Sequence, residues 1–366
     1  MRARVCALVA AIGLAAQPAC AQAEDGAAFW KKVQATCAAA AAKPPGELGR
    51  RIAQTAIDEF SHFGGHQIDA NGRLFRFGLT EAEHTEDDAG QQRAQLGQLG
   101  WWQVMKYWRS LFGTDAPDKI EVRGYRDAAG STKQEQSAEV LRSSAGELIR
   151  AADKVADPEV REMLREAALR GAILDTPWSA AFISYVIKQA GVGDDAFRFS
   201  NAHRVYIYDA FAASVAEPTN AAGNRLYRAC PLTTTRPRPG DMICQQREPT
   251  LADMSDVAVR ERIREEIAGG SDTRSIRRTH CELVAYIDAG ARKVYTIGGN
   301  VNQAVTARKL NLRGRGLMFS AAQKGHCGGA GHWTLPQSAT APPHAAAHAQ
   351  PCSLNDRKWF VLLQVR

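Results

Sequence analysis

Apolar residues recur at helical spacing through the first half of the chain and in short strand-like runs through the second. The helical periodicity predicts helices over 24–43, 46–63, 96–112, 135–155 and 158–172. The strand-like runs, separated by glycine-containing turns, are 205–208, 241–244, 281–287, 293–297, 305–310 and 359–365. A helical layer followed by an antiparallel meander predicts an α+β fold.

One further predicted helix, from Trp178 to the residue before Gly191, is apolar nearly all round, as expected of a helix inside a core. Thr176 is suited to be its N-cap, and Pro177 fits the first turn. Ser179 lies in that first turn, where unpaired N–H groups and the helix dipole favour an anion. Ser179 is therefore either a nucleophile beside an oxyanion hole or a second capping hydroxyl.

Three segments depart from the helix and strand pattern. The polar, helix-prone insertion 247–278 either covers the site as a lid or forms a solvated excursion. Residues 334–351, rich in proline, alanine and histidine, are expected to form a loop. The acidic run from Glu81 to Asp88 is expected to be solvated.

The first 23 residues have the pattern of a secretory signal peptide, with a charged start, an apolar stretch and an Ala-x-Ala cleavage site. No later stretch is long and apolar enough to predict a membrane span. We therefore expect an exported protein, periplasmic in location. Loss of Arg2 and Arg4 with the signal peptide lowers the formal net charge from +7 to +5. That excess suits an anionic polymer such as cell wall and ordinary solubility equally, while no basic helix indicates nucleic-acid binding.

Six cysteines follow the signal peptide, and an even number in an oxidising compartment favours disulfides. Proximity in the sequence suggests three pairs, namely Cys230–Cys244, Cys327–Cys352 and Cys37–Cys281. None of the six would then be a free catalytic thiol. His326, Cys327 and His332 resemble a zinc cluster in spacing, but the flanking glycines and the export signal favour a disulfide, so no metal is expected.

A histidine and an asparagine on neighbouring predicted strands complete a candidate site. His280 begins one strand, and the next ends in Gly298-Gly299-Asn300. A hairpin between them would bring Asn300 close to His280. Its amide would fix the imidazole tautomer and leave the other ring nitrogen to act on Ser179. The alternative is a histidine at a strand edge and a simple turn.

Four motifs, in this order, resemble the CHAP-type and NlpC-like papain-fold amidohydrolases and peptidases of the bacterial cell wall. They are Pro177–Phe182, Pro239-Gly240-Asp241, His280 and Ile297–Asn300. Over about 171–310 the chain is similar to a bacterial family catalogued as domain of unknown function 2272. The resemblance implies a papain-like domain over 171–366, in which a core helix packs on an antiparallel sheet, after a helical region at 24–170. It also implies hydrolysis of an amide or peptide bond in peptidoglycan.

Position by position, the resemblance makes Ser179 the nucleophile, His280 the general base and Asn300 the orienting group, without metal or organic cofactor. The active relatives carry cysteine at the nucleophile position, and a hydroxyl depends wholly on its base. Three hypotheses follow: a peptidoglycan hydrolase, an inactive cell-wall or protein-binding domain of the same fold, and an esterase.

Three further residues are candidates for binding substrate, namely Asp175, Trp178 and His203. His203 follows the core helix and is expected to line the cleft. Asp175 has a simpler interpretation as an acid that interacts with a helix dipole. The sequence leaves the oligomeric state open.

Overall fold

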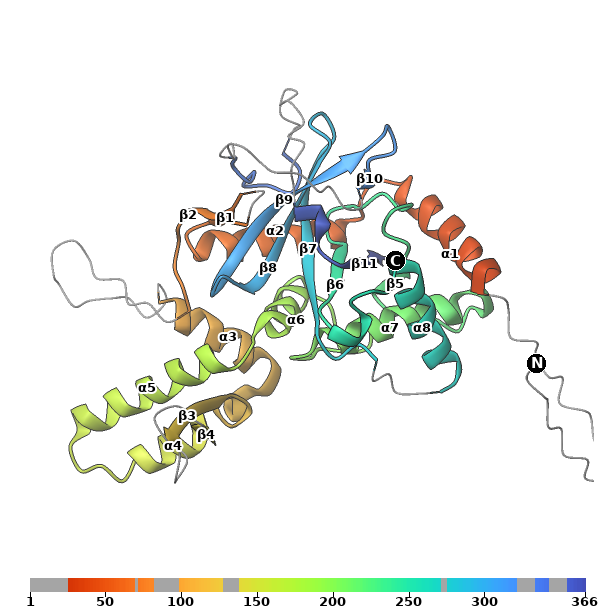
Figure 1. The fold of residues 1–366 in the computed structure, drawn as a ribbon. Coiled ribbons are helices and arrows are strands. Elements are labelled where there is room, and N and C mark those ends of the chain that lie inside the picture. Colours follow the sequence, from red (N-terminus) through yellow and green to blue (C-terminus); the bar gives the residue numbers. More distant parts are fainter. Residues whose placement is uncertain are drawn as a thin grey trace, which may run out of the picture.

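A mixed sheet forms the centre of the molecule (Figure 1). The structure is a computed structural model that describes residues 26–69, 72–81, 99–127, 138–270, 275–320, 333–341 and 354–366. Within these ranges the sheet has nine strands in the order β2-β1-β9-β8-β7-β6-β11-β5, with β10 paired to β9. The β1–β9 pair is parallel and the other pairs are antiparallel. The predicted α+β class is confirmed.

The strands of this sheet are mostly buried on both faces. Their bounds are β1 His66–Ile68, β2 Leu74–Arg76, β5 Tyr227–Cys230, β6 Met242–Gln246, β7 Thr279–Asp288, β8 Lys293–Val301, β9 Ala304–Arg313, β10 Met318–Phe319 and β11 Trp359–Val365. Burial on two faces explains why the runs are apolar almost throughout and lack the alternation of a half-exposed strand.

Helices cover both faces of the sheet. Their bounds are α1 Gly26–Ala41, α2 Glu47–His62, α3 Gly100–Phe112, α4 Ala145–Ala152, α5 Pro158–Asp175, α6 Ser179–Gln189, α7 His203–Ala216 and α8 Asp256–Ala268. α2 and α6 pack on one face, in a core that includes Ile52, Phe182 and Leu283. A second core contains Phe29 of α1 and Leu310. Because residues from 52 to 363 share the first core, the expected boundary at residue 170 crosses one continuous core.

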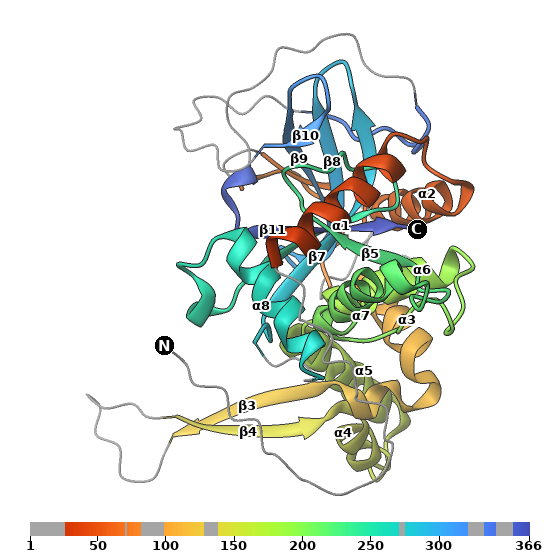
Figure 2. The ribbon, with the colours of Figure 1, turned by 90° about the vertical axis from the view of Figure 1, so that its right-hand side faces the viewer.

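An arm projects from this body (Figures 1 and 2). It consists of α4, α5 and the hairpin of β3 Glu121–Asp127 with β4 Ala138–Ser144. The predicted helix over 135–155 is therefore wrong in its first half. The helix begins only at Ala145, where Ser144 and Glu147 form a reciprocal capping box.

The predicted strand at 205–208 is also wrong, because these residues lie within α7. β-Branched and aromatic residues raise strand propensity, but α7 buries its side chains against β5 and α8. Tertiary packing therefore overrides local propensity here. β5 carries no strand prediction, although it pairs with β11.

The polar insertion 247–278 contains α8, which is a packed part of the body. Val259 and Ile263 are buried, and Arg260 donates to the carbonyl of Phe360 at 2.7 Å. Trp30 Nε1 of α1 donates to Glu261 at 2.8 Å. Of the expected loop at 334–351, residues 342–351 lie outside the described ranges.

Two disulfides are present among the described cysteines, Cys37–Cys230 and Cys244–Cys281. The predicted pairs Cys230–Cys244 and Cys37–Cys281 are wrong, because β6 and β7 are neighbours that place Cys244 opposite Cys281. The predicted pair Cys327–Cys352 and the signal peptide lie outside the described residues. Two disulfides indicate an oxidising, extracytoplasmic environment. No helix in the described ranges combines the length and apolar character needed to cross a membrane.

Candidate functional site

Ser179 is the first residue of α6, and its side chain is half-buried. The first intrahelical bond runs from Phe182 N to the carbonyl of Trp178 at 3.0 Å. The N–H groups of the residues before Phe182 therefore have no acceptor within the helix. The hydroxyl thus lies among backbone donors at the positive end of a helix dipole, as the sequence predicts.

His203 is the histidine that meets Ser179. The distance from Ser179 Oγ to His203 Nε2 is 2.6 Å. We expected His280 at this place, and the structure puts His203 there instead. His203 is the first residue of α7 and is 5% exposed, so two helices begin at the Ser179–His203 contact. The prediction of a strand at 205–208 leaves out the helix that begins at His203, and so it gives no reason to expect His203 at Ser179.

The other ring nitrogen of His203, Nδ1, contacts the hydroxyl of Tyr206 one turn along α7. Burial, followed by the charges of His280 and Arg247, lowers the pKa of His203 well below its ordinary value. The imidazole is therefore neutral at pH 7, with one nitrogen as donor and the other as acceptor. If Nδ1 carries the proton and donates to the Tyr206 oxygen, Nε2 can accept the Ser179 proton. If the Tyr206 hydroxyl donates to Nδ1, Nε2 carries the proton and cannot accept one.

His280 lies behind His203, with its ring edge-on at a centroid distance of 5.2 Å. Its Nε2 is 3.3 Å from Glu282 Oε1, and the structure shows no hydrogen bond from His280 to Ser179. Glu282 also accepts from Thr296 at 2.7 Å and pairs with Arg308 at 2.5 Å. Burial lowers the pKa of His280 to about 4. Burial opposes ionisation of Glu282, but Arg308 and the hydrogen bonds outweigh it and lower its pKa to about 2.

Asn300 binds a carboxylate rather than an imidazole. Its Nδ2 donates to Glu81 Oε2 at 3.0 Å, and Trp178 Nε1 donates to the same oxygen. We expected Asn300 to hold the ring of His280 and Glu81 to be solvated. Instead Glu81 is 2% exposed, and burial raises its pKa to about 7 although the Trp178 bond opposes this. No sequence signal marks Glu81 as a buried acid, because it lies in a loop beside exposed-type residues.

The two glycines before Asn300 allow β8 to pass between the site residues. A Cβ at Gly298 would lie 2.9 Å from Glu282 Cγ and 3.1 Å from His280 Nε2. A Cβ at Gly299 would lie 2.6 Å from Phe182 Cβ, on the α6 side. These contacts are too close for any side chain. The glycine pair therefore has a packing reason as well as the turn-forming role that the sequence suggests.

Two of the expected substrate-binding residues have other contacts. Asp175 is the last residue of α5 and accepts from Arg123 N at 2.7 Å, which attaches the β3–β4 hairpin. Trp178 is fully buried and stacks on Phe63 at 5.9 Å, so its indole has no surface for a ligand. Only His203 of the three lies at Ser179. Within the described residues, no three His, Cys, Asp or Glu side chains are grouped as metal ligands.

Comparison with protein-family models gives a match that covers most of the chain. Residues 95–365 fit the model of an uncharacterized protein conserved in bacteria (DUF2272). The chain belongs to this family. The DUF2272 match contains Ser179, His203 and His280, whereas Glu81 lies before it. No curated protein and no solved structure matches the chain.

Proposed function

We propose that this DUF2272 protein is an exported acyl hydrolase, with Ser179 as nucleophile and His203 as general base. The observation that carries the proposal is the 2.6 Å contact between Ser179 Oγ and His203 Nε2 at the start of two helices. A hydroxyl is a weak nucleophile unless a neighbouring base takes its proton. His203 is the neighbour with the geometry for that role, and its low pKa keeps it in the neutral form that a base needs.

The chemistry follows from these positions. Ser179 Oγ attacks the acyl carbon while its proton passes to His203 Nε2, and the N–H groups at the start of α6 stabilise the oxyanion. Protonated His203 then gives that proton to the leaving group, which leaves an acyl ester on Ser179. Water, activated in the same way, releases the acid and restores the serine. Nδ1 must carry a proton throughout, with the Tyr206 oxygen as its acceptor.

The substrate class that we propose is an amide or peptide bond of peptidoglycan. The resemblance of the Pro177–Phe182 motif to cell-wall amidohydrolases supports it, as does the oxidising environment that two disulfides indicate. Esters are easier substrates for a serine nucleophile because their leaving group is better. They therefore serve as first substrates for the test.

A second candidate is a binding domain without catalysis. The contact of Tyr206 with His203 Nδ1 favours it, because burial raises the pKa of Tyr206 well above its ordinary value and keeps the hydroxyl protonated. If that hydroxyl donates to Nδ1, Nε2 carries the proton and donates to Ser179, which is the wrong direction for a base.

A fluorophosphonate probe distinguishes the two candidates. Purified residues 24–366 with disulfides intact are incubated with the probe, and the intact mass is measured. The hydrolase proposal expects one adduct on the wild type and none on Ser179→Ala, followed by turnover of aryl esters and of muropeptides. A wild type without adduct and without turnover would leave the binding domain as the function.

A further inference from the structure

Arginines gather beside the Ser179–His203 pair. Gln245 of β6 pairs with His280 of β7, and side chains alternate along a strand. Arg247 therefore leaves the end of β6 on the same side as His280. Its backbone N–H donates to the carbonyl of Arg278 at 2.7 Å, which fixes the chain at this point. Arg308 of β9 reaches the same group through its contact with Glu282.

The positive charge in this group exceeds the negative charge. Glu282 is the acid that the structure places against these arginines, and Arg308 already pairs with it at 2.5 Å. Arg247 is exposed as a residue, and its guanidinium makes no hydrogen bond or ion pair with the described residues. Arg308 is 5% exposed, and its Nε has no hydrogen-bond partner in the described ranges. The Nε atoms of Arg228 and Arg260 are also buried without a partner among the described residues, so the Nε of Arg308 supports an acceptor here only together with the geometry of Arg247.

The charge of Arg247 also acts on the two histidines beside Ser179. After desolvation and the charge of His280, Arg247 is the next cause of the low pKa of His203. It contributes in the same direction at His280. Partial desolvation, followed by the charge of Arg308, lowers the pKa of Arg247 itself. An anion bound here would relieve all of these repulsions, and the two helix N-termini would attract it further.

We propose that Arg247, with Arg308 behind it, binds an anionic group of the substrate, a carboxylate or a phosphate, beside the acyl carbon that Ser179 attacks. The planar guanidinium matches either group through two parallel hydrogen bonds. This inference rests on the proposed function and narrows its substrate to anionic acyl compounds. Glu282 balances only part of the positive charge of the two arginines. The remaining positive charge is available to an anionic group of the substrate.

Matched aryl esters test the proposal kinetically. Mono-p-nitrophenyl glutarate and p-nitrophenyl butyrate differ chiefly by a terminal carboxylate. We expect the wild type to prefer the glutarate by roughly 5-fold in kcat/KM, as suits one solvent-exposed charge pair. Arg247→Gln should lose that preference, so the readout is the ratio of kcat/KM for the two esters in each variant. Arg262→Gln removes the same charge from α8, where the side chain is 53% exposed, and should keep the preference. Equal preference in wild type and Arg247→Gln would overturn the proposal.

Equilibrium binding tests the same site without catalysis. Full-length mature Ser179→Ala is titrated in a calorimeter with N-acetyl-Ala-Ala, with its C-terminal amide, with acetate and with inorganic phosphate. Tighter binding of the free acid than of the amide, lost in Ser179→Ala/Arg247→Gln, supports a carboxylate site. Tighter binding of phosphate than of acetate, with the same loss, supports a phosphate site. Binding that is the same with and without Arg247 overturns the inference. A failure of ester hydrolysis overturns the proposed function alone, so the two failures are distinguishable.

Discussion

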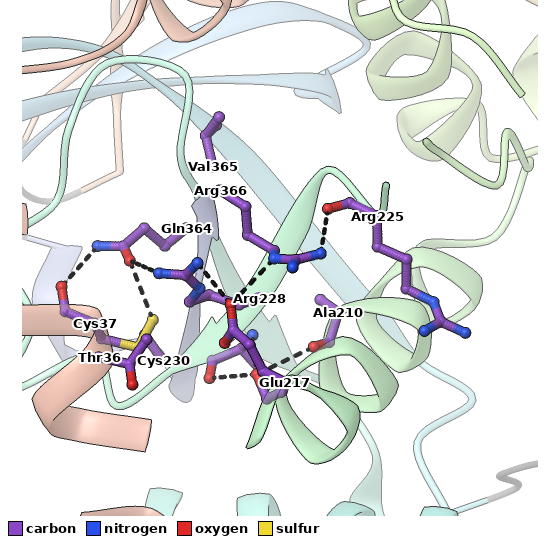
Figure 3. Close-up of polar contacts among 12 residues, drawn as sticks. Thr36, Cys37, Ala210, Glu217, Arg225, Arg228, Cys230, Gln364, Val365 and Arg366 are labelled. Atoms are coloured by element: carbon purple, nitrogen blue, oxygen red, sulfur yellow. Dashed lines mark hydrogen bonds and ion pairs between the residues drawn. A yellow bond between two sulfur atoms is a disulfide. The ribbon is translucent and has the colours of Figure 1, made fainter. Parts of the chain in front are cut away.

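Two clusters of charged side chains in the same body show how a structural group differs from a candidate reactive one. Around Glu217, one carboxylate oxygen accepts from Arg228 at 2.7 Å and from Arg366 at 3.1 Å (Figure 3). Gln364 joins this group to the Cys37–Cys230 disulfide by donating to the carbonyl of Cys37 at 3.1 Å. In this Glu217 cluster the carboxylate is shared between two arginines, and the cluster contains no nucleophile.

The cluster around His280 and Glu282 has a different balance. It holds two histidines with depressed pKa values, a serine at a helix start and an arginine whose guanidinium has no partner among the described residues. Local charge is left uncompensated on the side where Ser179 and His203 meet. The comparison teaches that burial of charge alone does not mark a site. The nucleophile at a helix start, in contact with a neutral histidine, does.

The largest losses of stability should come from removal of the two disulfides, and each cluster contains one of them. Cys37–Cys230 closes 193 residues and Cys244–Cys281 closes 37. Loop-closure entropy predicts a loss of about 5 kcal/mol for the Cys37→Ser/Cys230→Ser variant and about 4 kcal/mol for the Cys244→Ser/Cys281→Ser variant. Urea unfolding measures both.

Labelling by the fluorophosphonate should separate the same variants in the opposite order. Cys281 directly follows His280, and Cys244 directly precedes Gln245, which is paired with His280 across the two strands. Loss of the Cys244–Cys281 disulfide should therefore slow labelling. Loss of Cys37–Cys230 should leave the labelling rate of the folded protein unchanged. The reverse pattern would mean that the Glu217 cluster, rather than the His280 cluster, supports the reactive serine.

Removal of Glu217 tests the structural cluster directly. Glu217→Gln leaves Arg228 and Arg366 without their shared carboxylate, and because its side chain is only 23% exposed we expect a loss of about 3 kcal/mol in unfolding free energy. Glu47→Gln is the matched control, since Glu47 is 77% exposed and pairs with Arg51. It should lose less than about 0.5 kcal/mol. Similar losses in the two variants would mean that the Glu217 cluster contributes no special stability.

The glycine beside α6 should give the next effect. Gly299→Ala forces a Cβ to within 2.6 Å of Phe182, and overpacking of this kind costs about 2 kcal/mol. Gly46→Ala has nothing within 4 Å and a φ of −64°, so the loss at this N-cap position should be clearly smaller in thermal unfolding. A stable Gly299→Ala variant would contradict the close packing between β8 and the start of α6.

Glu81 should give the smallest effect, and one that depends on pH. Because its pKa is raised from 4.5 to about 7, the folded protein binds more protons than the unfolded chain in that window. The stability of the wild type should therefore fall, relative to Glu81→Gln, as pH rises from 4.5 to 7, by at least about 1 kcal/mol. Denaturation at a series of pH values measures the difference. A flat difference for Glu81→Gln would contradict a protonated, buried acid.

The sequence predicts the frame of this fold because apolar periodicity reports burial. The helices α2, α5 and α6 and the strands β6–β9 and β11 follow from it. It also predicts Ser179 at a helix start, because the Thr-Pro pair and the apolar run are local signals. Packing over long distances is where the predictions fail. α7 reads locally as a strand. Cys244 pairs with Cys281 because β6 and β7 are neighbours in the sheet, and Cys37 of α1 pairs with Cys230 of β5, 193 residues away.

The partners of Ser179 show the same limit. The sequence predicts His280 as the base and His203 as a residue that lines the cleft, and only the arrangement of α7 against α6 shows which ring reaches the hydroxyl. Glu81 is hidden for a related reason: its burial depends on the indole of Trp178 and the amide of Asn300, which are 97 and 219 residues away.

The central claim is that His203, and not His280, activates Ser179. The direct measurement is the rate of fluorophosphonate labelling, by intact mass, for wild type, His203→Ala and His280→Ala at equal folded concentration. Loss of a general base costs about 10²–10⁴ in rate, so His203→Ala should fall by that factor while His280→Ala falls by less than about 10-fold. Normal labelling of His203→Ala, together with loss of labelling in His280→Ala, would contradict the account.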